Sequence, residues 1–380
     1  MKAKGQVCTR CVMDQSVSDL TFDTNGVCSF CTFLDQRTKN RTLATSRTRD
    51  LKTVVDPIRA AGRGSKYDCV LGLSGGVDSS YTALVAVRAG LRPLIVHLDN
   101  GWNTEAAVHN IECVVRGLKL DLITHVIEWE EFRGLQLSLL RAGVVDLELV
   151  SDHAILACGF QQARRAKIQY IVTGDNEATE SKLPSGWNHR KTDLANIRSI
   201  NRAYENVPIR TFPTMSTLEL LRNTKLFGIR YADLLTYTDY VKERAMDELE
   251  SELGWRRYGS KHSESIITRF YQGYILPRKF GIDKRRFHSS LLIHAQQMTR
   301  EQALAELEEE PYDPRVQAAD KIYVCKKFGL TIAEFDQIMS EPPRRHDEFR
   351  SDARLVDTIF AANGMLRRLI PQGLRRNAAR

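Results

Sequence analysis

The chain has 380 residues, of which 42% are hydrophobic and 27% are charged, and its formal net charge is +8. These values are typical of soluble globular proteins, and no apolar stretch approaches the ~20 residues that cross a bilayer. The N-terminus, Met1 to Gln6, lacks the apolar core of a secretory signal. We therefore expect a cytoplasmic protein of two or three domains without a membrane span, whose positive charge suits an anionic partner.

Two pairs of cysteines near the N-terminus have the spacing of a metal site. Cys8 and Cys11 form one C-x-x-C pair, Cys28 and Cys31 form another, and 16 residues separate the pairs. Four thiolates complete the tetrahedral coordination of Zn²⁺ and leave no open position for water or substrate. The pattern predicts a structural zinc-ribbon-like module over residues 1–40. A redox role is less favoured, because neither pair lies between a strand and a helix.

Beyond this module, the chain alternates between two kinds of pattern. Residues 41–66 are predicted to be a linker with one short helix over 50–61. Apolar runs at 67–73, 93–98, 122–128 and 170–173 then alternate with helical patterns at 79–88, 104–117, 130–142 and 152–167. This alternation predicts an α/β domain over residues 67–215, with a parallel sheet that binds ligands at the carboxyl ends of its strands.

The C-terminal part of the chain lacks such strand patterns. After about residue 210 we expect no further strands. Helical patterns follow over 238–253, 264–274, 285–297, 300–309, 314–328 and 332–339. They predict a helical region over residues 216–380 that binds substrate or partners.

A glycine- and serine-rich segment, Ser74-Gly-Gly-Val-Asp-Ser-Ser80, joins the first apolar run to the helical pattern that follows it. Backbone N–H groups at a helix N-terminus attract anions, and glycine allows the backbone to approach phosphate oxygens closely. The serine hydroxyls add further donors. The G-x-x-x-x-G-K-[ST] pattern of kinases and GTPases is absent, which counts against transfer of a γ-phosphoryl group.

This segment resembles the signature of the PP-loop ATP pyrophosphatases, a superfamily that includes NAD synthetases and tRNA thiolases. The resemblance implies that the loop binds the β,γ-pyrophosphate of ATP through Ser74, Gly75, Gly76, Asp78, Ser79 and Ser80. It places adenosine at Leu98 and Asp99, which end the second strand, and the triphosphate near Gly174, which follows the fourth. Asp78 and Glu177 are the candidate Mg²⁺ ligands, and Lys182 would neutralise the leaving pyrophosphate.

A narrower resemblance, to the N-acetyl sugar amidotransferases, spans roughly residues 7 to 310. It rests on the stretches Cys8–Asp14, Gly72–Ser80, His97–Asn103, Tyr258–His262 and Thr268–Arg286. Those enzymes act in bacterial surface-polysaccharide synthesis, including lipopolysaccharide O-antigen. The resemblance implies that ATP adenylylates the acetamido oxygen of a nucleotide-linked sugar or uronic acid, and that ammonia displaces AMP to form an acetamidino group. The chain would then be an AMP- and PPi-forming C–N ligase that uses ATP, Mg²⁺ and Zn²⁺.

The same resemblance directs attention to a basic stretch with interleaved aromatic residues between 258 and 300. Within it, Lys261 and His262 follow a glycine in a predicted loop and are the expected catalytic pair. The diphosphate and the sugar carboxylate are expected to contact Arg269, Lys279, Arg285 and Arg286. For any one of these residues, a solvated helical surface is the alternative interpretation.

No pattern in the chain indicates a site that releases ammonia. Residue 2 is lysine, and Cys158 lacks the glycine two residues upstream that a nucleophile elbow needs. Separate glutaminase and ammonia-delivering partner subunits are therefore implied, and nucleic acid is not an expected partner.

Two other classes of protein remain as alternatives. A tRNA thiolase would share the phosphate loop, although Cys69, Cys113, Cys158 and Cys325 are isolated thiols of apolar context. A non-catalytic zinc-ribbon binding module would leave the phosphate loop unexplained.

Overall fold

The computed structural model of the protein describes residues 5–44, 50–176, 183–184, 186–258, 264–356 and 358. At its centre lies a five-stranded parallel sheet with the strand order β3-β2-β1-β4-β5. The strands are β1 (Cys69–Gly72), β2 (Pro93–Asp99), β3 (Leu122–Val126), β4 (Tyr170–Thr173) and β5 (Arg230–Asp233). The predicted α/β fold with a parallel sheet is confirmed, and so are the four predicted strands.

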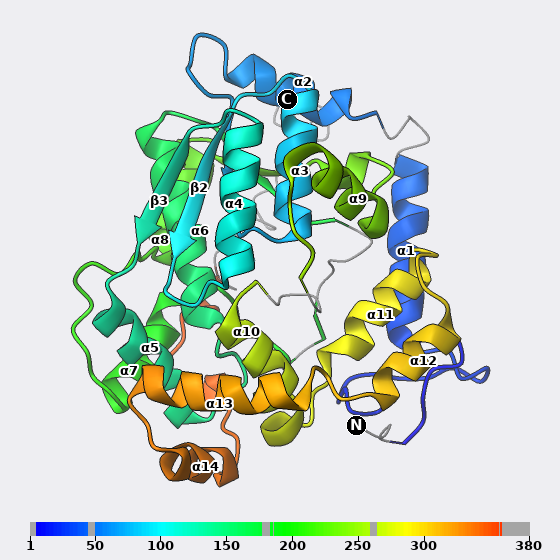
Figure 1. The fold of residues 1–380 in the computed structure, drawn as a ribbon, viewed down its shortest axis with the longest axis vertical. Helices are drawn as coiled ribbons and strands as arrows, with labels where there is room; N and C mark the ends of the chain where they lie inside the picture. The colour runs from blue at the N-terminus through cyan, green and yellow to red at the C-terminus, as the bar shows by residue number, and fades with distance from the viewer. Residues whose placement is uncertain are drawn as a thin grey trace.

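Helices cover both faces of the sheet (Figure 1). On one face, α3 (Val77–Arg88) connects β1 to β2 and α4 (Glu105–Gly117) connects β2 to β3. After β3 the chain forms α5 (Trp129–Ala142) and α6 (Leu149–Arg165), and α6 packs on β1, β2 and β4. Right-handed crossovers place α6 on the face opposite α3 and α4. The strand order therefore reverses between β1 and β4, where such sheets open a crevice for ligands.

The apolar composition of β1 and β2 explains why they lie at the centre of the sheet. β1 and β2 consist almost entirely of buried residues, as expected for strands that are covered by helices on both faces. Turn and cap residues then set the start of the following helices. The side chain of Thr104, for example, accepts the N–H of Ala107 and caps α4. The core thus fixes the carboxyl edge of the sheet, where the loops after β1, β2 and β4 meet.

Two elements differ from the sequence-based expectations. The expectation that strands end near residue 210 is wrong, because Arg230–Asp233 forms β5. This strand is short, contains two charged residues and, among the described residues, has a neighbouring strand on one side only, so no apolar run marks it. A helix, α1 (Ser29–Ala44), extends into the predicted linker, ahead of α2 (Lys52–Ala61). The polar sequence of α1 gives it no apolar stripe.

The C-terminal region is helical, as predicted. Its first longer helix packs on α3 and α4, and the later ones cross the lower part of the view in Figure 1. Its longer helices are α9 (Lys242–Leu253), α11 (Lys284–His294), α12 (Arg300–Glu308), α13 (Pro314–Phe328) and α14 (Ile332–Ser340). The helix predicted over 264–274 comprises α10 (Ile266–Phe270) and a π-helix, η3 (Tyr271–Phe280), that contains Pro277.

Further short helices complete the described part of the chain. They are α7 (Leu194–Ala203), α8 (Thr217–Leu221), η1 (Arg222–Leu226), η2 (Leu235–Tyr237) and η4 (His346–Glu348). None of the helices formed by the described residues is both long enough and apolar enough to cross a membrane.

Candidate functional site

The phosphate loop connects the end of β1 to the start of α3. Gly75 has a φ of +82°, a left-handed conformation. A Cβ added at this position would lie only 2.5 Å from the backbone oxygen of Ala107. Gly76 is the N-cap of α3. Glycine is therefore required at position 75, both for its backbone conformation and for the close approach to α4. The N-terminus of α3 lies at the carboxyl edge of the sheet, where anions are attracted.

Serine hydroxyls stabilise the loop from within. The Oγ atoms of Ser74 and Ser79 lie 3.2 Å apart. The N–H of Gly76 donates to Ser74 Oγ over 3.2 Å, and Ser79 Oγ donates to the carbonyl of Gly76 over the same distance. Ser80 is buried, and its hydroxyl has no hydrogen-bond partner among the described residues. The structure thus brings two of the three predicted serine hydroxyls together.

Three side chains that sequence reasoning missed hold the loop from outside. The indole N–H of Trp255 donates to the carbonyl of Gly75 over 3.1 Å, and Asn110 Nδ2 donates to the same oxygen over 3.3 Å. The hydroxyl of Tyr258 accepts the N–H of Val77 over 3.1 Å. Burial and the nearby Glu264 carboxylate raise the pKa of Tyr258, so its phenol stays protonated.

Asp78 lies in the first turn of α3, next to the end of β4. Its carboxylate accepts hydrogen bonds from the hydroxyl of Tyr240 and, over 3.4 Å, from Asn176 Nδ2. Gly174 shows how closely the two segments approach, since a Cβ there would lie 3.1 Å from the carbonyl carbon of Asp78 and the nitrogen of Ser79. Two neutral donors thus orient the carboxylate, which is the type of ligand that Mg²⁺ prefers.

The end of β2 carries the residues predicted to contact a nucleoside. Leu98 is buried, whereas the carboxylate of Asp99 accepts the backbone N–H two residues further on over 3.0 Å and so stabilises the turn. His97 was not predicted. Its Nδ1 lies 2.8 Å from the carbonyl of Leu73, and its Nε2 lies 3.0 Å from Asn103 Nδ2. Burial lowers the pKa of His97, and the two partners favour the neutral tautomer with hydrogen on Nδ1.

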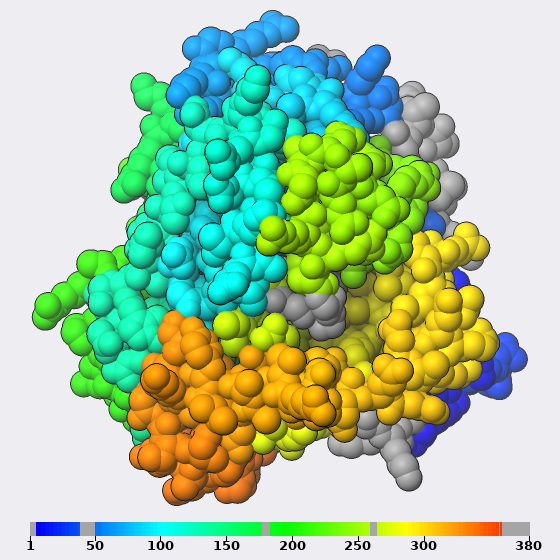
Figure 2. Space-filling model, viewed as in Figure 1, coloured from blue at the N-terminus to red at the C-terminus, as the bar shows by residue number. Residues whose placement is uncertain are grey.

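A cavity of about 590 Å³ begins at this edge of the sheet and extends toward α6, α10 and α11. Its wall includes three of the predicted nucleotide residues, Ser74, Leu98 and Gly174. The helical region supplies another wall, through Glu264, Thr268, Gln272, Lys284, Phe287 and His288. On the face shown in Figure 2, the surface is hollowed between the yellow and orange helices of this region and α9, in yellow-green. The cavity therefore joins the phosphate loop to the C-terminal helices.

Two lysines in the cavity wall are paired with carboxylates. Lys191 Nζ lies 2.8 Å from Asp146 and 2.8 Å from Asp152. Lys284 Nζ lies 3.2 Å from Glu148. Although burial alone would lower it, the neighbouring carboxylates raise the pKa of Lys191. Both ammonium groups are therefore offset by negative charge, and the wall presents donors and acceptors side by side. No sequence motif marked these residues.

The four basic residues expected to bind substrate do not line this cavity; they are Arg269, Lys279, Arg285 and Arg286. Arg269 pairs with Asp320 and Arg285 with Asp283, each at 2.8 Å. Lys279 donates to the backbone carbonyls of Ile338 and Glu341 over 2.5 and 2.9 Å. Arg286 is buried against the N-terminal module, 3.1 Å from Asp14. Arg285 also donates to the backbone oxygens of Glu306 and Glu309 over 2.8 and 3.1 Å. The structure thus places all four in contacts between elements of the fold.

The remaining predicted site residues lie outside the described part of the chain. They are the magnesium candidate Glu177 and the catalytic candidates Lys182, Lys261 and His262. Two described residues that shortly precede them in the sequence contact the phosphate loop or the helix after it. Asn176, before Glu177, contacts Asp78, and Tyr258, before Lys261, contacts Val77.

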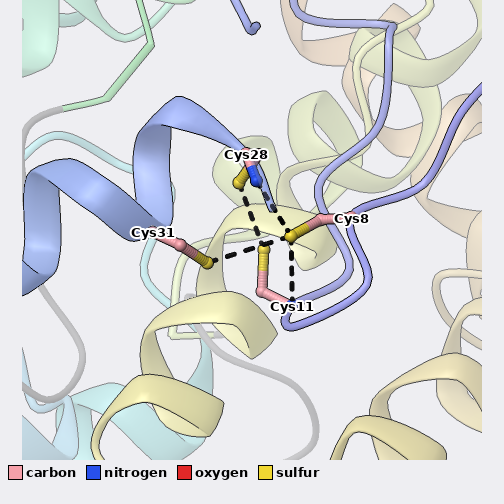
Figure 3. Close-up of side chains that lie close together, drawn as sticks. All are labelled: Cys8, Cys11, Cys28 and Cys31. Atoms are coloured by element: carbon pink, nitrogen blue, oxygen red, sulfur yellow. Dashed lines mark hydrogen bonds between the residues drawn. The ribbon is translucent and has the colours of Figure 1, made fainter. Parts of the chain in front are cut away.

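The four N-terminal cysteines converge on one point (Figure 3). Their sulfur atoms lie within 4.8 Å of one another, with Cys11 and Cys28 3.6 Å apart and Cys8 and Cys31 4.0 Å apart. Four thiolates about 2.3 Å from one Zn²⁺ ion would lie about 3.8 Å apart, so this spacing fits a tetrahedral metal site. The backbone N–H groups of Arg10, Cys11 and Cys28 point at Cys8 Sγ from 3.3 to 3.4 Å, as expected around a thiolate.

Buried contacts attach this metal module to α11 and α12. The guanidinium of Arg300 donates to the backbone oxygens of the first two cysteines over 3.0 and 3.1 Å. Arg286 donates to the carbonyl of Val12 over 2.9 Å, and the N–H of Val12 donates to Ser290 Oγ over 3.3 Å. The same helix α11 carries Lys284 in the cavity wall. The module therefore supports the helix that borders the cavity, and its four thiols would fill all four positions around a tetrahedral metal ion.

Comparisons with solved structures give distant neighbours, among them the three that follow. The NH3-dependent NAD synthetase from Campylobacter jejuni is 12% identical, with 77% of this chain and 96% of that chain covered and a TM-score of 0.32. The NMN synthetase from Francisella tularensis is 14% identical, with 56% and 97% covered and a TM-score of 0.28. The U34-tRNA thiolase NcsA from Methanococcus maripaludis is 10% identical, with 84% and 89% covered and a TM-score of 0.35. At these TM-scores the neighbours assign neither a reaction nor a substrate to this chain.

The sequence comparison is more specific for the C-terminal part of the chain. No curated protein matches the chain. Residues 264–362, however, match the family model described as the C-terminal domain of WbpG-like LPS biosynthesis proteins. This region includes α10 to α14 and the cavity-wall residues from Glu264 to His288. Over residues 264–362, the chain is therefore similar to the C-terminal domains of WbpG-like proteins.

Proposed function

We propose that the protein is an ATP-dependent amidotransferase that acts on a nucleotide-linked N-acetyl sugar or uronic acid in the synthesis of lipopolysaccharide or a related surface glycan. One observation carries this proposal: a single cavity is bordered by the phosphate loop and by the WbpG-like domain. The phosphate loop is suited to binding ATP. The WbpG-like domain is similar to domains of proteins that are described as LPS biosynthesis proteins. An enzyme that activates a sugar with ATP needs both partners in one cavity.

The sheet end of the cavity is the proposed ATP site. The β,γ-pyrophosphate would bind at the N-terminus of α3, where the loop offers N–H groups and the hydroxyls of Ser74 and Ser79. Asp78 would be a ligand of Mg²⁺ that is brought with the nucleotide. Glu177 and Lys182 remain proposals as the second carboxylate and the cation that neutralises pyrophosphate. For this reaction, these groups need only position the triphosphate and neutralise the charge that develops on the leaving pyrophosphate.

The far end of the cavity is the proposed acceptor site. Lys191, Lys284 and Gln272 offer donors, while Glu148 and Asp152 offer acceptors. A polyhydroxylated sugar uses both kinds of group, since each hydroxyl donates and accepts. A groove for tRNA would instead need cations that are not offset by carboxylates.

The acceptor contacts expected at the basic helices remain a prediction, and we propose a second set of contacts at the cavity wall. Arg269, Lys279, Arg285 and Arg286 are engaged in contacts between elements of the fold. Lys191, Lys284 and Gln272 are therefore our proposed substrate contacts in the described part of the chain. Lys261 and His262, from the segment after Tyr258, remain proposed catalytic residues.

The proposed reaction has two steps. The acetamido oxygen attacks the α-phosphorus of ATP, and the bond to the β-phosphate breaks with release of pyrophosphate. Ammonia then attacks the activated carbon, AMP leaves with the former amide oxygen, and the nitrogen loses a proton to give the amidine. The protein binds and orients both reactants and excludes water from the activated intermediate. A separate glutaminase and an ammonia-delivering partner would supply nitrogen. The N-terminal metal, which we propose to be zinc, is structural.

A tRNA thiolase is the second candidate, because Cys158 lines the cavity. Sulfur chemistry requires a thiolate, either as a carrier or as a ligand of a cluster. Burial raises the pKa of Cys158 to about 12, which keeps the thiol protonated at neutral pH. Within the described part of the chain, the one group of cysteines close enough to hold a metal is the N-terminal set. Formation of an amidine is therefore the better-supported chemistry.

The proposal is tested by incubating the purified protein with ATP, Mg²⁺, ammonium and a panel of nucleotide-linked N-acetyl sugars. We expect AMP and pyrophosphate only with an acceptor, and a sugar product about 1 Da lighter because NH replaces O. Asp78→Asn should abolish turnover. Asp239→Asn, at a carboxylate whose side chain is 83% exposed, should not. ADP as the nucleotide product, or sulfur transfer to tRNA, would contradict the proposal.

A further inference from the structure

The two edges of the sheet differ in character. The β5 edge carries the charged residues Arg230 and Asp233. The β3 edge reads Leu-Ile-Thr-His-Val, with no proline and no permanently charged side chain. Leu122 is 38% exposed, Ile123 36% and Val126 70%. Proteins normally protect an open edge with charges, prolines or a covering segment. The β5 edge is protected by charge, whereas the β3 edge is apolar on both of its faces.

The backbone of β3 also has a side that β2 does not use. The N–H of Ile95 donates to the carbonyl of Asp121 over 3.0 Å, and the N–H of Ile127 donates to the carbonyl of Asp99 over 2.9 Å. Peptide groups alternate in direction along a strand, so Leu122, Thr124 and Val126 direct theirs away from β2. No strand of the described residues lies on that side.

We propose that this edge is a homodimer interface, in which β3 pairs antiparallel with β3 of a second copy. A two-fold axis at Thr124 makes the strand pair with itself, as the symmetry of a closed dimer requires. In this register Leu122 lies opposite Val126 of the second copy, twice, and Ile123 lies opposite His125. The outward peptide groups then form about six hydrogen bonds, and the two sheets become one continuous sheet.

The charges beside β3 support a second copy as the occupant. Lys119 precedes the strand and Glu128 follows it, and both are exposed. Asp121, directly before the strand, is offset by Lys66 at 2.9 Å, so the net charge of that end is positive. Antiparallel pairing brings the basic end of each strand next to the acidic end of the other, so the two ends complement each other twice. A parallel arrangement would place like charges together. The pairing also directs the carboxyl edges of the two sheets in opposite directions, so both cavities open away from each other.

Sedimentation velocity of the full chain over a range of concentrations tests this interface. We expect a dimer whose dissociation constant rises at least about 100-fold in Val126→Lys, because each dimer contains the substitution twice. The matched control is Leu226→Lys, at a leucine that is 72% exposed in η1, and it should leave the dimer unchanged. Circular dichroism and bound metal would confirm that both variants are folded.

Cross-linking tests the register without weakening the interface. Directly paired residues lie about 5.5 Å apart, within the range of a disulfide. Thr124→Cys should therefore link to itself on mild oxidation, whereas Val126→Cys should link only to Leu122→Cys in a mixed sample. The unsubstituted chain controls for its own cysteines. A monomer at all concentrations would overturn the proposal. A dimer that tolerates Val126→Lys, or that fails to link through Thr124→Cys, would do the same.

Discussion

Replacing Gly75 by alanine tests whether the shape of the phosphate loop controls nucleotide binding. The residue has a φ of +82°, and an added Cβ would lie 2.5 Å from the backbone oxygen of Ala107. Ordinary contact begins near 3.4 Å, so the loop must move about 0.9 Å away from α4. Misplacement by about 1 Å can reduce activity by about 100-fold, which is the loss that we expect here.

Gly64 provides a matched control for this experiment. Its φ is +79°, almost the same as that of Gly75, but an added Cβ would have no atom within 4 Å. Gly64→Ala should therefore show only the conformational strain, about 1–2 kcal/mol in the free energy of unfolding. ATP affinity from calorimetry, together with thermal unfolding, separates the two effects. The reasoning is refuted if Gly75→Ala binds ATP as tightly as Gly64→Ala and turns over at the same rate.

Three further predictions concern the metal, the acceptor and pH. Cys28→Ser should lose the bound metal and the hydrogen-exchange protection of α11, because the module is attached to that helix, whereas Cys113→Ser should keep both. Lys284→Gln should raise the KM for the acceptor about 10- to 100-fold through loss of a charged donor, and should leave the dissociation constant for ATP unchanged. Burial and the adjacent His189 lower the pKa of His346 to about 4. The neutral form therefore stabilises the fold above pH 6.5, and up to about 3 kcal/mol is lost as pH falls from 6.5 toward 4. Thermal unfolding of His346→Gln should vary less with pH over that window, and an unchanged slope would contradict the assignment.

Much of the fold could be predicted from the sequence because its signals are local. The strands β1 and β2 are apolar runs between helical patterns, so the local sequence distinguishes them. β5 could not be found in this way. It is as short as β1, but two of its four residues are charged, and its position depends on pairing with β4, which is distant in the sequence. The π-helix after α10 could not be predicted either, since its hydrogen bonds differ from those of an α-helix without any change in apolar content.

The site also contains features that local sequence patterns predict and features that depend on distant contacts. The turn at Gly75, the cap at Gly76 and the grouping of four cysteines follow from short patterns with a fixed geometry. Trp255 and Tyr258 contact the loop from about 180 residues away, as the two donor–acceptor separations show. No local pattern reports such contacts.

The basic residues of α10 and α11 illustrate a different limit. Arg285 and Lys284 are neighbours in the sequence and have the same charge. One pairs with Asp283 on its own helix cap, and the other lies in the cavity wall beside Glu148. Only the packing of α11 against the metal module decides which of the two faces the cavity. Composition alone assigns both to the same role.

The most direct test of the proposed chemistry is to follow the amide oxygen of the acceptor. A nucleotide-linked sugar labelled with ¹⁸O in its acetamido group would be incubated with the protein, ATP, Mg²⁺ and ammonium, and the nucleotide products analysed by mass spectrometry. Adenylylation of the amide oxygen predicts AMP that is about 2 Da heavier, with unlabelled pyrophosphate. Label in inorganic phosphate, with ADP as the nucleotide product, would contradict it, and so would label that remains in the sugar product.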